Sequence, residues 1–319
     1  MSIELKNVTY TYSPGTAYES HALKDVSLVI PDGQFIGIIG HTGSGKSTLI
    51  QHLNALVQPT SGQVLYNGED VWAEKYDRKQ LRSEVGLVFQ YPEHQLFEND
   101  VISDVCFGPM NQGLSREEAE KEAKQALTHV GVKESNFKKS PFELSGGQKK
   151  RVAIAGVLAM NPKILILDEP TAVLTPQETE KLFTVLRNMR EAGHSIIIIT
   201  HKLHEVLSLS DRVSVLRKGA YIGTVQTKDA TEASLTEMMV GKKVALNIER
   251  PEPVNPQKRL VMEHVTCVDK EGVKTLDDAG FTAYSGEILG IAGIAGSGQK
   301  ELLETIAGLQ PMEGGTIRY

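Results

Sequence analysis

Two cysteines, one tryptophan and no long apolar run are the scarcities that first limit what this 319-residue sequence encodes. Cys106 and Cys267 lie far apart without metal-ligand spacing, so neither a disulfide framework nor a thiolate metal centre is expected. The longest aliphatic run, Ile196 to Ile199, is far too short to cross a bilayer. We therefore predict a soluble chain whose membrane role, if it has one, comes through a partner.

An excess of basic residues is also missing, since the formal net charge is −6. This balance argues against a broad nucleic-acid surface, and no nucleic acid is expected as a partner. Residues 1–5 run directly into an alternating strand pattern, so no signal peptide is expected.

A glycine-rich stretch is the strongest motif present. It matches G-x-x-x-x-G-K-[ST], the phosphate-binding P-loop, and consists of Gly40, His41, Thr42, Gly43, Ser44, Gly45, Lys46, Ser47 and Thr48. The apolar run 35–39 before it predicts a buried strand, and Leu49, Ile50, Leu53 and Leu56 after it recur at helical spacing. In this setting backbone N–H groups bind phosphate, Lys46 reaches the β- and γ-phosphates, and Ser47 ligates Mg²⁺.

Two carboxylates follow the buried strand pattern of residues 164–167. Burying Asp168 and Glu169 there is costly unless they meet a cation or perform chemistry. Asp168 fits a residue that holds Mg²⁺, and Glu169 fits the base that polarises an attacking water.

Polar residues end other predicted strands. Gln90 follows the strand pattern 85–89 and faces a nucleotide if the sheet is open, although this signal is weak by itself. His201 follows residues 195–200, where the γ-phosphate is expected. Tyr12, near the end of the first strand, fits an adenine-stacking residue and a half-buried strand tyrosine equally well.

Helical patterns separate these strands. Residues 115–118 form a capping box, and residues 91–143 are predicted to be a helical insertion. The sequence Leu-Ser-Gly-Gly-Gln at 144–148 opens a helix whose first turn carries Lys149, Lys150 and Arg151, which composition favours as a solvated basic turn. Thr175, followed by proline and a glutamate, opens a further helix.

Together these motifs resemble the nucleotide-binding subunit of ABC transporters over about residues 2–243. The resemblance implies an α/β P-loop NTPase fold with a RecA-like core, an antiparallel β subdomain and a helical insertion at about 91–160. It implies ATP and Mg²⁺ as ligands, Gln90 as a catalytic and metal-site residue, and His201 as a catalytic residue. It further implies that two subunits enclose two ATP molecules, each contacted by the partner's Ser145, Gly146, Gly147 and Gln148.

Two branches of this family are visible. Residues 1–171 look most like the ATPases of energy-coupling-factor transporters. Two stretches carry this resemblance: Gln90-Tyr91-Pro92-Glu93-His94-Gln95-Leu96-Phe97 and Phe107-Gly108-Pro109. From Thr171 onward the chain looks like the tandem ATPases of sugar and nucleoside importers. Thr175 keeps the helix cap but lacks the carboxylate with which the first branch contacts its partner subunit.

An internal repeat marks a second copy. From Leu276 the sequence realigns with Leu23 onward at an offset of 253, but Gln299 replaces Lys46 and Lys300 replaces Ser47. We predict a complete ATPase domain at 1–243, a proline-containing linker at 244–258 and a truncated, degenerate domain at 259–319. No Mg-ATP site is expected in that second copy.

The predicted function is the ATPase subunit of an ABC importer, bound peripherally at the cytoplasmic face of the membrane. Its expected partners are a second ATPase subunit and an integral membrane subunit. The expected complex is an energy-coupling-factor transporter for vitamins or transition metals. Residues 91–113 are expected to dock on that subunit, with Leu96 and Phe97 as anchors or as internal packing. A sugar or nucleoside importer, a soluble ABC ATPase and a hybrid without coupled activity remain alternatives.

Overall fold

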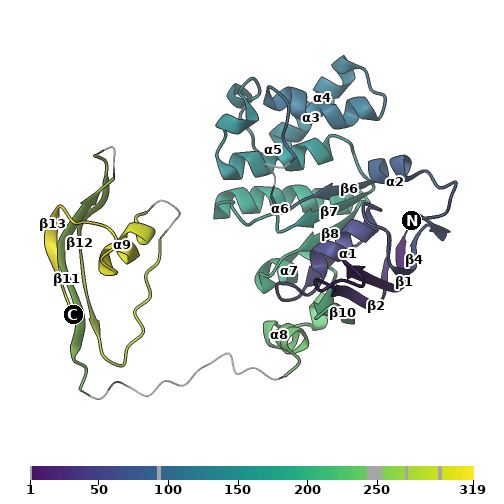
Figure 1. Ribbon diagram of the computed structural model, residues 1–319. Helices are drawn as coiled ribbons and strands as arrows, with labels where there is room; N and C mark the ends of the chain where they lie inside the picture. The colour runs from purple at the N-terminus through teal and green to yellow at the C-terminus, as the bar shows by residue number, and fades with distance from the viewer. Residues whose placement is uncertain (1, 92–94, 243–252, 254, 270–271, 294–296) are drawn as a thin grey trace. The chain divides into compact units, whose positions relative to one another are not determined.

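The computed structural model describes residues 2–91, 95–242, 253, 255–269, 272–293 and 297–319. The predictions made on residues 92–94 and on most of the linker at 244–258 fall outside these ranges. The chain divides into two compact units, Met1–Val244 and Ala245–Tyr319, each with a sheet of its own (Figure 1). Within the described ranges, no helix has the length and apolar character needed to span a bilayer.

The first unit is built around a six-stranded sheet in the order β10-β9-β3-β8-β7-β6. Its strands are β3 (Phe35–Ile39), β6 (Val85–Val88), β7 (Ile164–Asp168), β8 (Ser195–Ile199), β9 (Arg212–Arg217) and β10 (Ala220–Gln226). Every pair is parallel except the edge pair β9–β10. Strands β3, β6, β7 and β8 are buried along their whole length, which explains their continuous apolar sequences. The predicted α/β fold class is confirmed.

An antiparallel sheet in the order β2-β1-β4-β5 packs with the central sheet in one apolar core. It comprises β1 (Ile3–Tyr12), β2 (Ser20–Ile30), β4 (Ser61–Tyr66) and β5 (Glu69–Asp70). Asn67 and Gly68 join β4 to β5 with φ angles of 53° and 86°. Two positive φ angles are what a tight hairpin turn requires, and asparagine and glycine adopt them more readily than other residues.

The helix after the P-loop, α1 (Lys46–Leu53), is shorter than its apolar pattern predicts. Leu49, Ile50 and Leu53 are buried, but Leu56 lies beyond the helix and is 42% exposed. The prediction that Leu56 continues the buried helical face is therefore wrong. Ala55, which lies between the end of α1 at Leu53 and Leu56, has a φ of 50°. This left-handed conformation turns the chain away from the helix axis.

The remaining helices of this unit are α2 (Arg78–Glu84), α3 (Val101–Asn111), α4 (Arg116–His129), α5 (Gly146–Leu158), α6 (Pro176–Glu191), α7 (Leu203–Leu209) and α8 (Glu232–Val240). Figure 1 shows α3, α4 and α5 grouped together, as the predicted helical insertion requires. Full capping boxes begin α4 at Ser115, α5 at Ser145 and α6 at Thr175, because each hydroxyl and its glutamate or glutamine exchange hydrogen bonds with the backbone.

The second unit repeats the start of the first. A sheet in the order β12-β11-β13 comprises β11 (Lys258–Val268), β12 (Lys274–Tyr284) and β13 (Gly314–Arg318) and carries α9 (Gln299–Ile306). Helix α9 begins 253 residues after α1, and each follows a glycine with a left-handed φ, 98° at Gly45 and 85° at Gly298. The repeat in sequence thus corresponds to a repeat in backbone structure.

The counterpart of β3 behaves differently in the second unit. Residues 287–291 form no strand, and Ile288 is 74% exposed, whereas Phe35 at the equivalent position is 1% exposed. Strand β3 is paired on both sides, by β8 and β9. The described part of the second unit has no equivalent of either neighbour, so these apolar side chains stay at the surface.

Candidate functional site

The P-loop connects β3 to α1, as its sequence context predicts. Gly45 is required here for two reasons: its φ is 98°, and a side chain would meet the carbonyl oxygen of Ala22 at 2.4 Å. The Ser44 hydroxyl is buried and finds no hydrogen-bond partner within the described part of the chain. The loop therefore combines a close-packed backbone with a buried polar group that a ligand can satisfy.

Lys46 starts α1 and folds back over its own loop. Its Nζ donates to the carbonyl oxygens of Gly40 at 2.6 Å and His41 at 3.0 Å. Burial lowers the pKa of this ammonium, while the charges of Glu169 and Asp168 oppose that shift. Both carboxylates therefore act on the lysine electrostatically, although they come from a different strand.

Asp168 and Glu169 lie at the carboxyl end of β7, beside the P-loop. The Ser47 hydroxyl donates to Asp168 Oδ2 at 3.2 Å, which brings together two residues expected to hold Mg²⁺. Burial raises the pKa of the Asp168 carboxyl, and the hydrogen bond from Ser47 works against that shift. A nearby cation would relieve the cost of burying this charge.

Glu169 has an unusual backbone and one unsatisfied oxygen. Its φ is 47°, and its N–H donates to the Ile199 carbonyl at the end of β8. Oε1 lies 3.0 Å from His201 Nδ1, whereas Oε2 is buried and has no hydrogen-bond partner among the residues that the structure describes. The structure thus places the predicted base, Glu169, and the predicted catalytic histidine, His201, in direct contact.

These groups line one cavity of about 430 Å³. Of the predicted site residues it is lined by Tyr12, Thr42, Gly43, Gly45, Lys46, Ser47, Thr48, Gln90, Asp168, Glu169 and His201. Tyr12 is 41% exposed, and its hydroxyl lies 3.1 Å from Thr48 Oγ1, so its ring is held at the cavity wall. Its role in adenine stacking stays a prediction.

The donors present fit Mg²⁺. Within the described residues no cluster of three or more His, Cys, Asp or Glu side chains forms a protein-only metal site. Mg²⁺ in nucleotide sites does not need one, because it keeps waters and phosphate oxygens and takes few protein ligands. A serine hydroxyl and one strand-end carboxylate in contact are the protein part of such a site.

Four residues are expected to contact the ATP of a partner subunit, and we call residues 145–148 the signature residues. They lie apart from this cavity. Ser145 is the N-cap of α5 and is exposed together with Gly146, while Gly147 and Gln148 are half-buried. None of the four lines the cavity of the P-loop. Their exposed position leaves them accessible to another molecule.

The first turn of α5 is not the solvated basic turn that composition favours. Lys150 is completely buried, and its Nζ donates to three backbone carbonyls. Arg151 donates to the Gly131 carbonyl at 2.7 Å and forms an ion pair with Glu178 at 2.7 Å. The expectation was wrong because Lys150 shares a helix face with buried Ala153 and Ile154, a periodicity that composition alone does not register.

A buried carboxylate behind His201 was also missed. Glu205, 1% exposed, accepts hydrogen bonds from Thr171 at 2.7 Å and Thr200 at 3.2 Å and pairs with Lys202 at 3.1 Å. It fixes the segment after β7 to the segment after β8. In the sequence, Glu205 stands four residues after His201. Glutamates at this spacing are too frequent for the sequence alone to indicate a buried, functional carboxylate.

Comparisons with known proteins follow the same motifs. The ABC transporter family pattern matches residues 23–172. The chain is 49% identical over 220 residues to the energy-coupling factor transporter ATP-binding protein EcfA2 of Caldanaerobacter subterraneus, covering 69% of this chain and 77% of that protein. It is 50% identical over 224 residues to EcfA2 of Streptococcus pyogenes, covering 70% and 80%.

Solved structures show the same fold. The dimeric ATP-binding cassette MJ0796, bound to ADP and Pi, matches with a TM-score of 0.65 at 31% identity, covering 70% of this chain and 98% of that one. The structure of cbiO1 from Clostridium perfringens, part of the ABC transporter complex cbiONQ, matches with a TM-score of 0.62 at 40% identity, covering 71% and 89%.

Fold and site thus define a P-loop ATPase of the cassette type. The chain belongs to the ABC transporter ATPase family, as its motifs predict. Its similarity to the energy-coupling-factor ATPases extends over about 70% of its length.

Proposed function

We propose that this chain is the ATP-hydrolysing subunit of an energy-coupling-factor importer and acts at the cytoplasmic face of the membrane. The observation that carries the proposal is one cavity lined by Lys46, Ser47, Asp168, Glu169 and His201. The chain that forms it is 49% and 50% identical, over 69% and 70% of its length, to energy-coupling factor transporter ATP-binding proteins. Vitamins or transition metal ions are the proposed solute class.

Each residue then has a defined task. The P-loop N–H groups and Lys46 bind the phosphates, and Ser47, Asp168 and Gln90 hold Mg²⁺, which when bound neutralises charge on the β- and γ-phosphates. Glu169 accepts the proton of the attacking water through Oε2, the oxygen without a partner. His201 orients Glu169 through Oε1 and lies where the γ-phosphate is expected.

Two chains form the working unit in this proposal. Residues 145–148 of one chain, of which Ser145 and Gly146 are exposed, close over the ATP held by the P-loop of the other. Two observations support this arrangement. Residues 145–148 do not line this chain's own cavity, and the similar cassette MJ0796 is dimeric in its solved structure. Thr175 supplies no carboxylate to that interface, so we propose weaker contact there.

A groove between α2 and α3 is the proposed docking site for the membrane subunit. It has a volume of about 790 Å³ and is lined on one side by α2 and on the other by Phe107 and its neighbours. Phe97 and Phe107 are 57% and 45% exposed and meet edge to face, with ring centroids 4.7 Å apart. Leu96 is 6% exposed inside the helical core, so the choice of Leu96 as a surface anchor was wrong.

Co-expression with two baits tests this docking. The transmembrane subunit of an energy-coupling-factor transporter should capture the chain, and a sugar permease should not. Replacing Phe97 and Phe107 with alanine should weaken capture, since exposed aromatic pairs supply much of the binding energy at interfaces. The matched control is Y18A, because Tyr18 is an aromatic residue 87% exposed away from the groove. Capture by the sugar permease alone would favour the second candidate, a sugar or nucleoside importer.

We also propose that the chain consists of a complete domain, a linker and a partial second copy. We assign residues 1–243 to the complete ATPase domain, 244–258 to a linker and 259–319 to a degenerate partial copy. The division of the chain near residue 244 and the shared backbone of α1 and α9 support this assignment. In place of the P-loop lysine, Gln299 donates to the Ile291 carbonyl, and it supplies no cation for phosphate.

A further inference from the structure

Lys150 has a position that its place in a helical first turn does not explain. Its side chain is completely buried, and Nζ donates to the carbonyl oxygens of Phe89 at 2.9 Å, Gln90 at 3.0 Å and Asp168 at 3.3 Å. An ammonium group has three N–H bonds, and three carbonyls accept from it here. Burying a charged group without such partners costs several kcal/mol, so this arrangement strongly favours one side-chain geometry.

The three carbonyls belong to the two segments that carry the chemistry. Phe89 and Gln90 follow β6, and Gln90 lines the nucleotide cavity. Asp168 ends β7 and precedes Glu169. Lys150 itself does not line the cavity, so it acts on these residues through their backbone.

The helix that carries Lys150 is the one that begins with the signature residues. Ser145 caps α5, and Lys150 lies five positions further along the same short helix. A displacement of residues 89–90 relative to α5 would therefore break the hydrogen bonds from Lys150 to Phe89 and Gln90 or move the helix. This makes a short mechanical connection between the chain's own nucleotide cavity and its exposed signature.

We propose that Lys150 is a positioning residue that couples the two ATP sites of the dimer. It transmits the state of Gln90 and Asp168, at the ATP of its own chain, to residues 145–148, at the ATP of the partner. This inference rests on the proposed dimeric arrangement and adds the residue that links its two sites.

The adjacent residue provides a strict comparison. Arg151 is also a basic residue with little exposure, and it binds α5 to Gly131 and to Glu178. Those contacts lead to the end of α4 and the start of α6, and Arg151 also donates to the Gly147 carbonyl at 3.4 Å within α5. None of these three contacts involves Gln90 or Asp168. Loss of Arg151 should therefore destabilise the same helix without uncoupling the sites. K149M removes a charge from the same turn at a side chain that forms no hydrogen bond or ion pair with the described residues.

The test measures the ATP dependence of hydrolysis in the full chain carrying K150M, K150R, R151M or K149M. Wild type should show a Hill coefficient above one. K150M should lower it toward one and reduce kcat by about tenfold, equivalent to about 1.4 kcal/mol, while the Kd for ADP changes less than about twofold. K150R should recover much of the cooperativity, because a guanidinium group also donates several hydrogen bonds. R151M should lower the Tm yet keep the Hill coefficient, and K149M should match wild type.

A wild-type Hill coefficient in K150M, or an equal loss of cooperativity in R151M at a matched fall in Tm, would overturn the inference. If K150M does not fold, K150R decides, since a folded K150R with a Hill coefficient of one also contradicts it. A wild-type chain that hydrolyses ATP without cooperativity would refute the coupling and leave the proposed ATPase function intact. A chain that hydrolyses no ATP would refute both the coupling by Lys150 and the proposed ATPase function.

Discussion

His201 Nδ1 lies 3.0 Å from Glu169 Oε1, and the glutamate reaches this position from a backbone φ of 47°. Left-handed backbone at a residue other than glycine costs about 1 kcal/mol or more and is frequent at functional sites. The contact orients one carboxylate oxygen and leaves the other buried without a partner. The geometry suits a base that binds a water molecule.

The first prediction follows from this contact. E169Q keeps the shape of the side chain but removes the base, so ATP hydrolysis should fall by about 10²-fold or more. ATP binding should persist, and ATP-bound dimers should accumulate on size-exclusion chromatography. H201A should cause a smaller loss, because it removes the orienting group and leaves the base. Normal turnover by E169Q would show that another group activates the water.

The second prediction concerns the degenerate copy. Deleting residues 250–319 should leave one ATP bound per chain in calorimetry, because Gln299 stands where the phosphate-binding lysine is needed. The deletion should also improve solubility, since it removes exposed Ile288 and Leu303. A halved nucleotide stoichiometry would mean that the second unit binds nucleotide.

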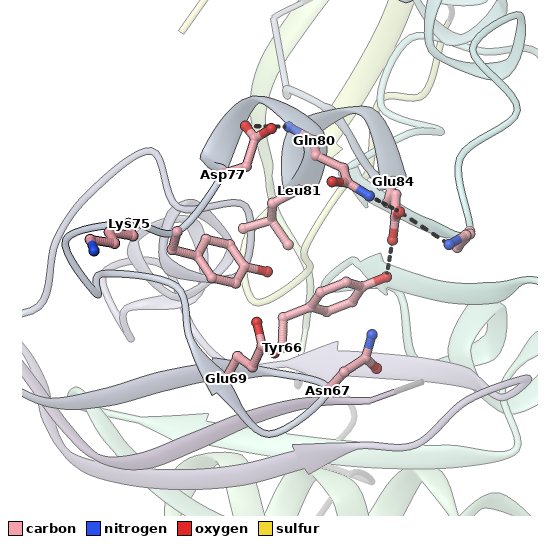
Figure 2. A pocket seen from close by; sticks show the side chains of 10 residues that line it. Tyr66, Asn67, Glu69, Lys75, Asp77, Gln80, Leu81 and Glu84 are labelled. Carbon is pink, nitrogen blue, oxygen red and sulfur yellow. Dashed lines mark hydrogen bonds and ion pairs between the residues drawn. The ribbon is translucent and has the colours of Figure 1, made fainter.

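The third prediction uses a second cavity, of about 450 Å³, between the β4–β5 hairpin and α2. Figure 2 shows Tyr66 and Glu84 pointing toward one another there, and the Tyr66 hydroxyl donates to Glu84 Oε2 at 2.7 Å. Burial by itself raises the pKa of the Glu84 carboxyl, but hydrogen bonds from Tyr66, Lys163 and Gln80 outweigh it and hold that pKa below its usual range. The ionised form of Glu84 is therefore favoured by folding.

Y66F removes one of these hydrogen bonds and should cost about 1–2 kcal/mol of unfolding free energy at pH 7. A depressed carboxylate pKa contributes stability above its unfolded value, which is lost as the pH falls through the folded value. The difference between wild type and Y66F should therefore shrink below about pH 4, which denaturant titrations at pH 7 and pH 3.5 will measure. A constant difference across this range would show that the bond does not depend on the charge of Glu84.

Much of the fold was readable because its signals are local. The buried strands were marked by continuous apolar residues, and the helix starts at Ser115 and Thr175 by capping patterns that depend on four consecutive residues. The P-loop and the carboxylates of β7 were predicted in the same way. Their convergence on one cavity follows from the parallel sheet, which brings the carboxyl ends of its strands to one edge.

The errors concern residues whose surroundings come from elsewhere in the chain. Lys150 looks like a surface lysine until β6 and β7 bring three carbonyls to it. Leu96 looks like a surface anchor until the helical core closes over it. The β3 counterpart at residues 287–291 has the sequence of a strand but finds no neighbouring strands to pair with among the described residues. Sequence pattern specifies the element, and distant contacts decide its exposure.

The central claim is that the P-loop cavity hydrolyses ATP in a complex with an energy-coupling-factor membrane subunit. The measurement that tests it most directly is phosphate release by the co-purified complex, compared between wild type and K46A. Lys46 is the cation of the loop, so K46A should lose most of its ATP affinity by calorimetry and release phosphate at the background rate. Our account predicts steady turnover by wild type and none by K46A. Equal phosphate release by the two complexes would contradict it.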